Sequence, residues 1–321
     1  MIDSDCLPYI LQHDSIAHLE GDVLYIGDRR AYPFKREFVK VSSATEAAAA
    51  IKAMVTQGGG PLEVALWAMV LTARRRESLK DAARVLSLAR PTNTTMAREL
   101  ELILSLLSDR EEVPSEDVEA LVVSRLDHYD SLYEKMSDRG SSLIADGDGI
   151  LTTCFAEHSF FLSVLKAREN GKDVVVYVPE TRPYLQGAHL TAPSFQELGV
   201  KTYLITDAMP SALMREGRIQ KYMTAADLAL EDRCVVNKVG TLGNAIAAKY
   251  FSIPYYAFSV GLDKSKKSID DIVIEYRSAE EVKFCQNQRI TGEGVDALYP
   301  AFDIIEPSLV TGIITGDGEL L

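Results

Sequence analysis

The segment Gly149-Ile-Leu-Thr-Thr-Cys-Phe-Ala-Glu-His-Ser159 is the most informative part of the sequence. A short apolar run, 149–151, ends in small polar residues and a thiol, and an amphipathic run, 159–170, follows. This order predicts a buried strand, a tight turn and a helix. Cys154 is then expected at the carboxyl end of a strand, where open α/β sheets bind ligands, and beside a helix N-terminus that favours a thiolate or a phosphate. A free cysteine is also often a small buried hydrophobe, and this segment alone leaves both roles open.

Strand-like and helix-like segments alternate after this stretch. Strands are predicted at 150–153, 174–178, 202–205, 229–230, 255–258 and 272–275. Helical patterns fit between most of them. Such alternation implies right-handed crossovers and a parallel, Rossmann-like sheet.

The residues before this region predict a different kind of domain. Short strands are expected at 23–26 and 38–41, and helices at 44–54, 61–75, 95–107 and 115–135. Ser43 is expected to cap the first helix, with Glu46 as its capping-box partner. The turn-prone stretch Ser137-Asp-Arg-Gly140 predicts the domain boundary. The fold class is therefore α/β, with a mostly helical N-terminal domain that includes short strands (1–137) and a Rossmann-like catalytic domain (138–321).

The amino-acid composition limits the classes of molecule that the protein is expected to bind. The chain has 321 residues and a formal net charge of −13, which argues against nucleic acid as a partner because no basic surplus can neutralise phosphates. A few local cations can still bind a small anion. The four cysteines are widely spaced, which fits neither a zinc site nor a disulfide framework. The chain shows no signal peptide and no apolar run of about 18 residues, so we expect a cytoplasmic protein without membrane contact.

Several polar residues in the second half are candidates for chemistry. Asp227 stands among small and apolar residues, where burial would raise its pKa, or it is an ordinary helix or turn cap. Asn237 and Lys238 open a loop before an alanine-rich helix, whose N-terminal N–H groups can bind an anion; otherwise Lys238 is a solvated surface lysine. His158 is either an acid–base group beside Cys154 or a helix cap. No dinucleotide fingerprint follows a strand and no metal cluster is visible, so no cofactor and no metal are expected.

Four segments together resemble a known family. They are the stretch around Cys154, Glu180-Thr-Arg-Pro-Tyr-Leu-Gln-Gly-Ala-His-Leu-Thr191, Ala225-Ala-Asp227 and Asn237-Lys-Val-Gly-Thr241. Their combination resembles the methylthioribose-1-phosphate isomerases, which are related to ribose-1,5-bisphosphate isomerase and to the regulatory subunits of translation initiation factor 2B. The resemblance continues through segments 274–277, 300–303 and 309–315, and reaches back to 89–92 and 57–61.

The resemblance implies an aldose–ketose isomerase of methionine salvage. Its substrate would be a 5-substituted ribose 1-phosphate, such as S-methyl-5-thioribose 1-phosphate, and its product the ribulose 1-phosphate. Cys154 and Asp227 match the family's catalytic pair. The positions implied to bind the sugar phosphate are Gln57, Gly58, Gly59, Arg90, Gln186, Asn237 and Lys238. Arg182, on the same loop as Gln186, is interpreted instead as a structural partner of Glu180. The family forms homodimers, so a homodimer is expected.

The alternative is a noncatalytic regulatory subunit, like those of translation initiation factor 2B, that binds a sugar phosphate or a nucleotide. The presence of both Cys154 and Asp227, together with the strand-containing N-terminal extension, favours the enzyme.

The chain also departs from the family pattern. Gln57 stands where an arginine is usual, and residues 155–158 replace small polar residues. His189 replaces an arginine, and Tyr299 replaces an asparagine. Because glutamine cannot supply charge to a phosphate, these departures predict an altered specificity around retained chemistry.

Overall fold

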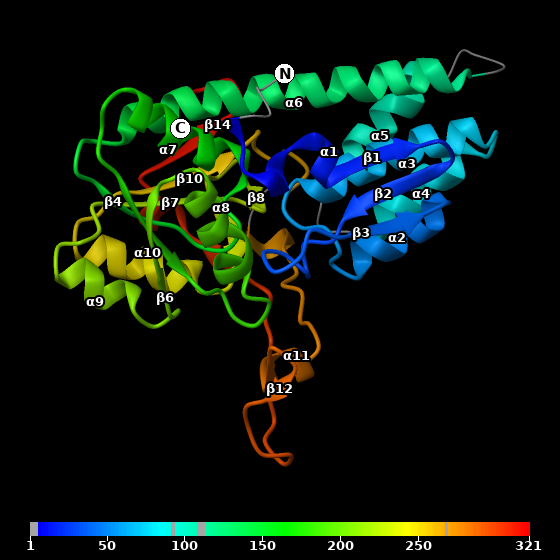
Figure 1. Cartoon of the computed structure of the whole chain (residues 1–321). Helices are drawn as coiled ribbons and strands as arrows, with labels where there is room; N and C mark the ends of the chain where they lie inside the picture. Colours follow the sequence, from blue (N-terminus) through cyan, green and yellow to red (C-terminus); the bar gives the residue numbers. More distant parts are fainter. Residues whose placement is uncertain (1–5, 91–93, 108–112, 267–268) are drawn as a thin grey trace. The chain divides into compact units, whose positions relative to one another are not determined.

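The structure is a computed structural model that describes residues 6–90, 94–107, 113–266 and 269–321 (Figure 1). The chain divides into two compact units, Met1–Ser131 and Leu132–Leu321. The division falls inside the long helix α6 (Ser115–Leu143). The expected end of this helix at Lys135 was therefore wrong, and the residues thought to mark a domain boundary are helical.

Gly140 explains why a turn-like sequence is helical. A Cβ atom at this position would lie 2.2 Å from Oγ of Ser163 and 2.9 Å from ring carbons of Phe258. The glycine therefore lets α6 pack closely against α7 (Glu157–Glu169) and β10 (Tyr255–Ser259). Its function is close packing and not a chain break.

The first unit combines a small sheet with helices. Its antiparallel sheet has the order β1-β2-β3. The strands are β1 (Ala17–Glu20), β2 (Val23–Gly27) and β3 (Phe38–Val41). The helical elements are η2 (Tyr9–Leu11), α1 (His13–Ile16), α2 (Ala44–Lys52), α3 (Gly60–Arg74), α4 (Leu79–Ala89), α5 (Thr94–Leu107) and the first part of α6. The predicted strands β2 and β3 and helices α2, α3 and α5 are confirmed, whereas β1 and α4 were missed.

Helix α3 forms the centre of this unit. From Gly60 to Ala73 its residues are buried, apart from the half-buried Trp67. It contacts α2, α4, α5 and two strands of the small sheet. A helix covered on all sides has no need of a polar face, which accounts for its alanine- and leucine-rich sequence.

The cap of α2 is only partly as expected. The Ser43 side chain accepts a hydrogen bond from the Glu46 backbone N–H at 3.2 Å. The Glu46 carboxylate accepts from the backbone N–H of Ser42 at 2.7 Å, and not from that of Ser43. The N-cap is confirmed, and the reciprocal bond is displaced by one residue.

The second unit is built on a six-stranded parallel sheet of order β14-β10-β7-β4-β5-β6. The strands are β4 (Gly149–Leu151), β5 (Val175–Pro179), β6 (Lys201–Ile205), β7 (Lys221–Ala225), β10 (Tyr255–Ser259) and β14 (Gly312–Thr315). The chain proceeds outward from β4 to β6, then returns to the other side of β4 and proceeds from β7 to β14. This is the doubly wound Rossmann order, which confirms the predicted fold class.

The other elements of this unit flank or extend the sheet. The helices are α7, η3 (Gly187–Thr191, a π-helix), α8 (Ala192–Glu197), α9 (Pro210–Arg215) and α10 (Thr241–Tyr250). A small antiparallel sheet of order β13-β9-β8 joins β8 (Leu228–Ala229), β9 (Val235–Lys238) and β13 (Phe302–Ile305). The remaining elements are η4 (Ile269–Asp271), α11 (Glu280–Lys283), β11 (Phe284–Cys285), β12 (Gln288–Arg289) and η5 (Pro307–Leu309).

Between β10 and β13 the chain forms an arm that includes α11, β11 and β12 and projects from the parallel sheet (Figure 1). The strand predicted at Ile272–Glu275 falls in this arm and was wrong, because only an isolated bridge joins Tyr276 to Pro300 there. Among the described residues, no helix is long and apolar enough to cross a membrane.

Candidate active site

The two expected catalytic residues follow the neighbouring strands β4 and β7, between which the strand order of the sheet reverses. Cys154 comes after β4, and Asp227 comes after β7. The strands pair in parallel with Leu151 opposite Tyr222, so both residues lie beyond the carboxyl edge. Ligands of doubly wound sheets bind in the crevice at this switch point.

The backbone of Cys154 is held in an unusual conformation. Its φ angle is 66°, in the left-handed region that non-glycine residues seldom occupy. The Cys154 N–H donates to Oγ1 of Thr181 at 3.1 Å, and Oγ1 of Thr191 donates to the Cys154 carbonyl at 2.6 Å. Such strain persists where the surroundings enforce it, and it is concentrated at functional sites.

The loop that holds Cys154 is itself anchored. Thr181 also has a positive φ, of 62°. The Asp207 carboxylate accepts hydrogen bonds from the backbone N–H groups of Thr181 and Arg182, both at 2.8 Å. Burial, together with the nearby charge of Asp207, raises the pKa of Glu180. The carboxylate of Asp207 thus fixes the turn that supports the thiol.

Arg182 does not form the expected pair with Glu180. Its guanidinium donates to the backbone carbonyls of Val282 and Phe284, both at 2.9 Å. No ion pair joins Arg182 and Glu180 in the part of the chain that the structure describes. Arg182 therefore ties the loop after β5 to the arm, a role that local sequence spacing did not reveal.

Gln186 presents a buried amide on the same loop. Its side chain is 3% exposed, and its Oε1 has no hydrogen-bond partner among the described residues. A buried polar atom without a partner is uncommon in native proteins and calls for an explanation. This amide is therefore suited to contact a ligand.

Lys238 is buried at the end of β9, which overturns both its expected loop position and the surface alternative. Its side chain is 3% exposed. The ammonium donates to the Tyr299 hydroxyl at 3.2 Å. It also lies 5.9, 5.6 and 5.3 Å from the ring centres of Tyr184, Tyr299 and Phe302. Aromatic faces attract a cation, so these rings help to retain a charged group inside the protein.

The N-terminus of α10 is not the open anion site that the sequence predicted. The Asp303 carboxylate accepts from the backbone N–H groups of Gly240 at 2.7 Å and Leu242 at 3.0 Å. Asp303 therefore already supplies the negative charge that a helix N-terminus favours. Asn237 is buried close by, and its amide donates to Oγ1 of Thr241 at 3.2 Å.

Asp227 lies in an exposed bend between β7 and β8. The expectation that this acid is buried is therefore not met.

Two histidines border the thiol segment and the Gln186 loop. His158 is buried in α7, and its ring stacks on Tyr133 at 4.9 Å with an interplanar angle of 4°. Ala156, and not His158, occupies the N-cap, so the capping role was wrong, while the acid–base role stays a prediction. Burial lowers the pKa of His189, which favours the neutral imidazole at neutral pH.

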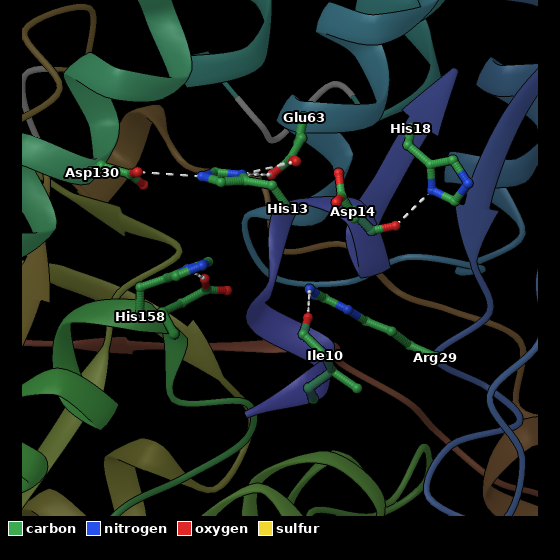
Figure 2. A network of polar contacts seen from close by, with 9 residues as sticks. Ile10, His13, Asp14, His18, Arg29, Glu63, Asp130 and His158 are labelled. Atoms are coloured by element: carbon green, nitrogen blue, oxygen red, sulfur yellow. Dashed lines mark hydrogen bonds and ion pairs between the residues drawn. The ribbon is translucent and has the colours of Figure 1, made fainter. Parts of the chain in front are cut away.

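Three of the candidates in the first unit, Gln57, Gly58 and Gly59, directly precede α3. Gln57 is buried, and its Oε1 has no partner within the described ranges. Gly58 has a φ of 63°, and Gly59 is the N-cap of α3. The guanidinium of Arg29, which sequence analysis did not single out, donates to the carbonyl of Gln57. It also donates to the carbonyl of Ile10 at 2.8 Å (Figure 2).

Arg90 is the C-cap of α4. The Pro91 and Thr92 that accompany it lie outside the described residues. Gln57, Gly58, Gly59 and Arg90 thus belong to one unit, and Cys154, Gln186, Asp227, Asn237 and Lys238 to the other.

Comparison with known proteins decides the family. The Initiation factor 2 subunit family matches residues 41–320. The chain belongs to this family. Methylthioribose-1-phosphate isomerase of Thermotoga neapolitana is 36% identical over 318 residues, which span 94% of this chain and 93% of the relative. A putative methylthioribose-1-phosphate isomerase of Methanocaldococcus jannaschii is 35% identical over 311 residues, 92% of this chain and 91% of the relative.

Solved structures include both branches of the family. The 5-methylthioribose 1-phosphate isomerase of Pyrococcus horikoshii matches with a TM-score of 0.82 and 28% identity over 94% of this chain and 91% of that one. The delta subunit of translation initiation factor eIF-2B from A. fulgidus gives a TM-score of 0.78 and 31% identity over 94% of both chains. The predicted family and its isomerase class of enzyme are confirmed.

Proposed function

We propose that this protein converts a 5-substituted ribose 1-phosphate, such as S-methyl-5-thioribose 1-phosphate, to the corresponding ribulose 1-phosphate. The observation that carries the proposal is the position of Cys154, strained and half-buried at the switch point of the sheet. The names of its relatives support the same substrate class.

The chemistry requires an acid and a base. In an aldose 1-phosphate the anomeric carbon carries the phosphate ester, so the ring cannot open spontaneously to a free aldehyde. One group must protonate the ring oxygen so that the ring opens, and another must act as the base in the transfer of hydrogen between C2 and C1. We assign these steps to Cys154 and Asp227, which lie past adjacent strands.

The remaining candidates suit recognition of the sugar phosphate. Lys238 offers a buried ammonium, and Gln186 offers an amide oxygen with no partner among the described residues. In the first unit, Arg90 offers a guanidinium, the group that binds phosphate in a bidentate manner. Gln57 offers an amide where the family pattern has charge. Each of the two cations, Lys238 and Arg90, is therefore a candidate partner for the phosphate charge.

The direct test is to incubate the purified protein with S-methyl-5-thioribose 1-phosphate and follow ketose formation by NMR. Ribose 1-phosphate and 5-deoxyribose 1-phosphate are tested in parallel, and the free sugars serve as controls. We expect turnover of at least one 1-phosphate. Turnover of free sugars alone would refute the phosphate requirement.

A noncatalytic regulatory subunit is the second candidate, because the TM-score of the A. fulgidus eIF-2B delta subunit, 0.78, is close to the 0.82 of the Pyrococcus horikoshii isomerase. The same assay separates the two. Sugar-phosphate binding without turnover of any 1-phosphate would favour the regulatory role.

We also propose that the protein is a homodimer. Large apolar side chains are exposed on the arm and next to it: Val273, Tyr276, Ile290, Val295 and Leu298. Clustered exposed apolar groups commonly mark interaction surfaces, and most homo-oligomers are symmetric dimers. The cytoplasmic location stays a prediction.

A further inference from the structure

The hydroxyl of Tyr299 has a hydrogen atom that no described residue accepts. The side chain is 3% exposed, and its hydrogen bond is the one from Lys238, at 3.2 Å. An ammonium group can only donate, so the phenolic oxygen is the acceptor in this bond. The Tyr299 O–H is then a buried donor with no acceptor in the described part of the chain. Native proteins seldom leave such a donor unused.

The surroundings of Tyr299 hold its ring in place. Its backbone carbonyl accepts from the N–H of Arg277 at 2.9 Å. Its ring lies 6.3 Å from that of Tyr184 and contributes to the aromatic surroundings of Lys238. The donor is therefore pre-positioned, which is the arrangement that stabilises charge at low reorganisation cost.

The Tyr299 hydroxyl also lies within electrostatic range of the Cys154 thiol. Burial raises the pKa of Tyr299, and Cys154 is among the neighbours that raise it further. The hydroxyl is thus protonated at neutral pH and lies near the residue to which we assign the chemistry. Lys238 polarises its O–H bond, because a donated hydrogen bond makes the acceptor a better donor.

We propose that Tyr299 donates a hydrogen bond to the substrate oxygen at C2, at the reacting end beside Cys154. The inference rests on the proposed isomerase function and adds a residue to it. The C2 hydroxyl loses its proton as the C2–H hydrogen moves to C1 and the ketone forms, so the C2 oxygen carries negative charge on the way, while the C1 oxygen stays bonded to phosphorus. A bond that strengthens in the transition state acts on kcat more than on KM.

The test compares Tyr299→Phe with wild type on the sugar 1-phosphate that wild type isomerises fastest. The substitution removes one oxygen and keeps the ring. We expect kcat to fall about 10- to 100-fold, as for loss of a hydrogen bond to a charged group, with KM changed less than about threefold. The matched control is Tyr255→Phe, which removes a buried hydroxyl bonded to Thr224 at 2.9 Å and should leave kcat within about twofold.

Tyr299→His provides an independent check, because it keeps a ring with an N–H donor. It should be at least about fivefold faster than Tyr299→Phe, or within about tenfold of wild type if the phenylalanine variant does not fold. The inference would be overturned if Tyr299→Phe kept the wild-type kcat, or if only its KM rose. An equal loss of kcat in Tyr255→Phe, or a kcat of Tyr299→His below the stated values, would also overturn it. If wild type turns over no sugar 1-phosphate, the proposed isomerase function is wrong, and the role of Tyr299, which depends on it, is wrong as well.

Discussion

A half-buried histidine between two carboxylates gives the most quantitative prediction for the first unit. Nδ1 of His13, in α1, lies 3.0 Å from both carboxylate oxygens of Glu63, in α3 (Figure 2). Its Nε2 lies 3.3 Å from Asp130, in α6. Burial alone lowers the pKa of His13, but the two carboxylates outweigh it and raise the pKa from 6.5 to about 10. The charged ring therefore fastens the N-terminal extension to two helices.

The perturbation is His13→Gln, which leaves Glu63 and Asp130 buried without their cation. The difference between 6.5 and about 10, at about 1.4 kcal/mol per pKa unit, sets an upper bound of about 5 kcal/mol. Because the His13 side chain is 29% exposed, solvent screening reduces this figure. We expect the variant to lose about 3 kcal/mol of unfolding free energy near pH 6, at the lower end for breaking a buried pair.

The pH dependence has a definite sign. The folded-state pKa of His13 is raised, so its stabilisation is fully present below pH 6.5 and is lost as pH rises through about 10. Urea unfolding of wild type and variant at pH 6, 8 and 10 should therefore show a difference that shrinks with pH. His18→Gln is the control, because that ring contacts the exposed Glu20 and a backbone carbonyl. A difference below about 1 kcal/mol at pH 6, or one that is equal at pH 6 and 10, would refute this reasoning.

Two further predictions concern packing and assembly. Gly140→Ala should destabilise the protein by about 1–3 kcal/mol in urea unfolding, because its Cβ meets Ser163 and Phe258. Gly243→Ala in α10, whose Cβ meets nothing within 4 Å, should be neutral or stabilising, and an equal loss in both variants would contradict the packing argument. Light scattering at micromolar concentration should give twice the chain mass of 35.4 kDa, and the monomer mass would contradict the proposed homodimer.

The parts of the fold that could be predicted from the sequence are those in which a local pattern of apolar and turn-forming residues indicates the secondary structure and its burial. Strands β4, β5 and β10 are apolar runs between turn signals, and their order implied a Rossmann-like sheet. Strand β7 was missed because it begins with Lys221 and includes Thr224, although it is central in the sheet. Lys221 is tolerated there because it pairs with Asp148 at 3.0 Å.

The site was harder to predict where contacts come from distant segments. Lys238 looked like a loop lysine because Tyr184 and Tyr299, which help to bury it, are far away in the sequence. The N-terminus of α10 looked open because Asp303, which caps it, follows the helix by more than 50 residues. Periodicity and spacing describe neighbours along one element, and these contacts are made between elements.

We propose that Cys154 and Asp227 together carry out the isomerisation of a sugar 1-phosphate. The most direct measurement is turnover of S-methyl-5-thioribose 1-phosphate by wild type, Cys154→Ser and Asp227→Asn, with substrate binding measured by calorimetry in each variant. We expect both variants to bind the substrate and to lose on the order of 100-fold or more in kcat. Wild-type turnover in either variant would contradict the assignment of that residue, and wild-type turnover in both would contradict the account of the site.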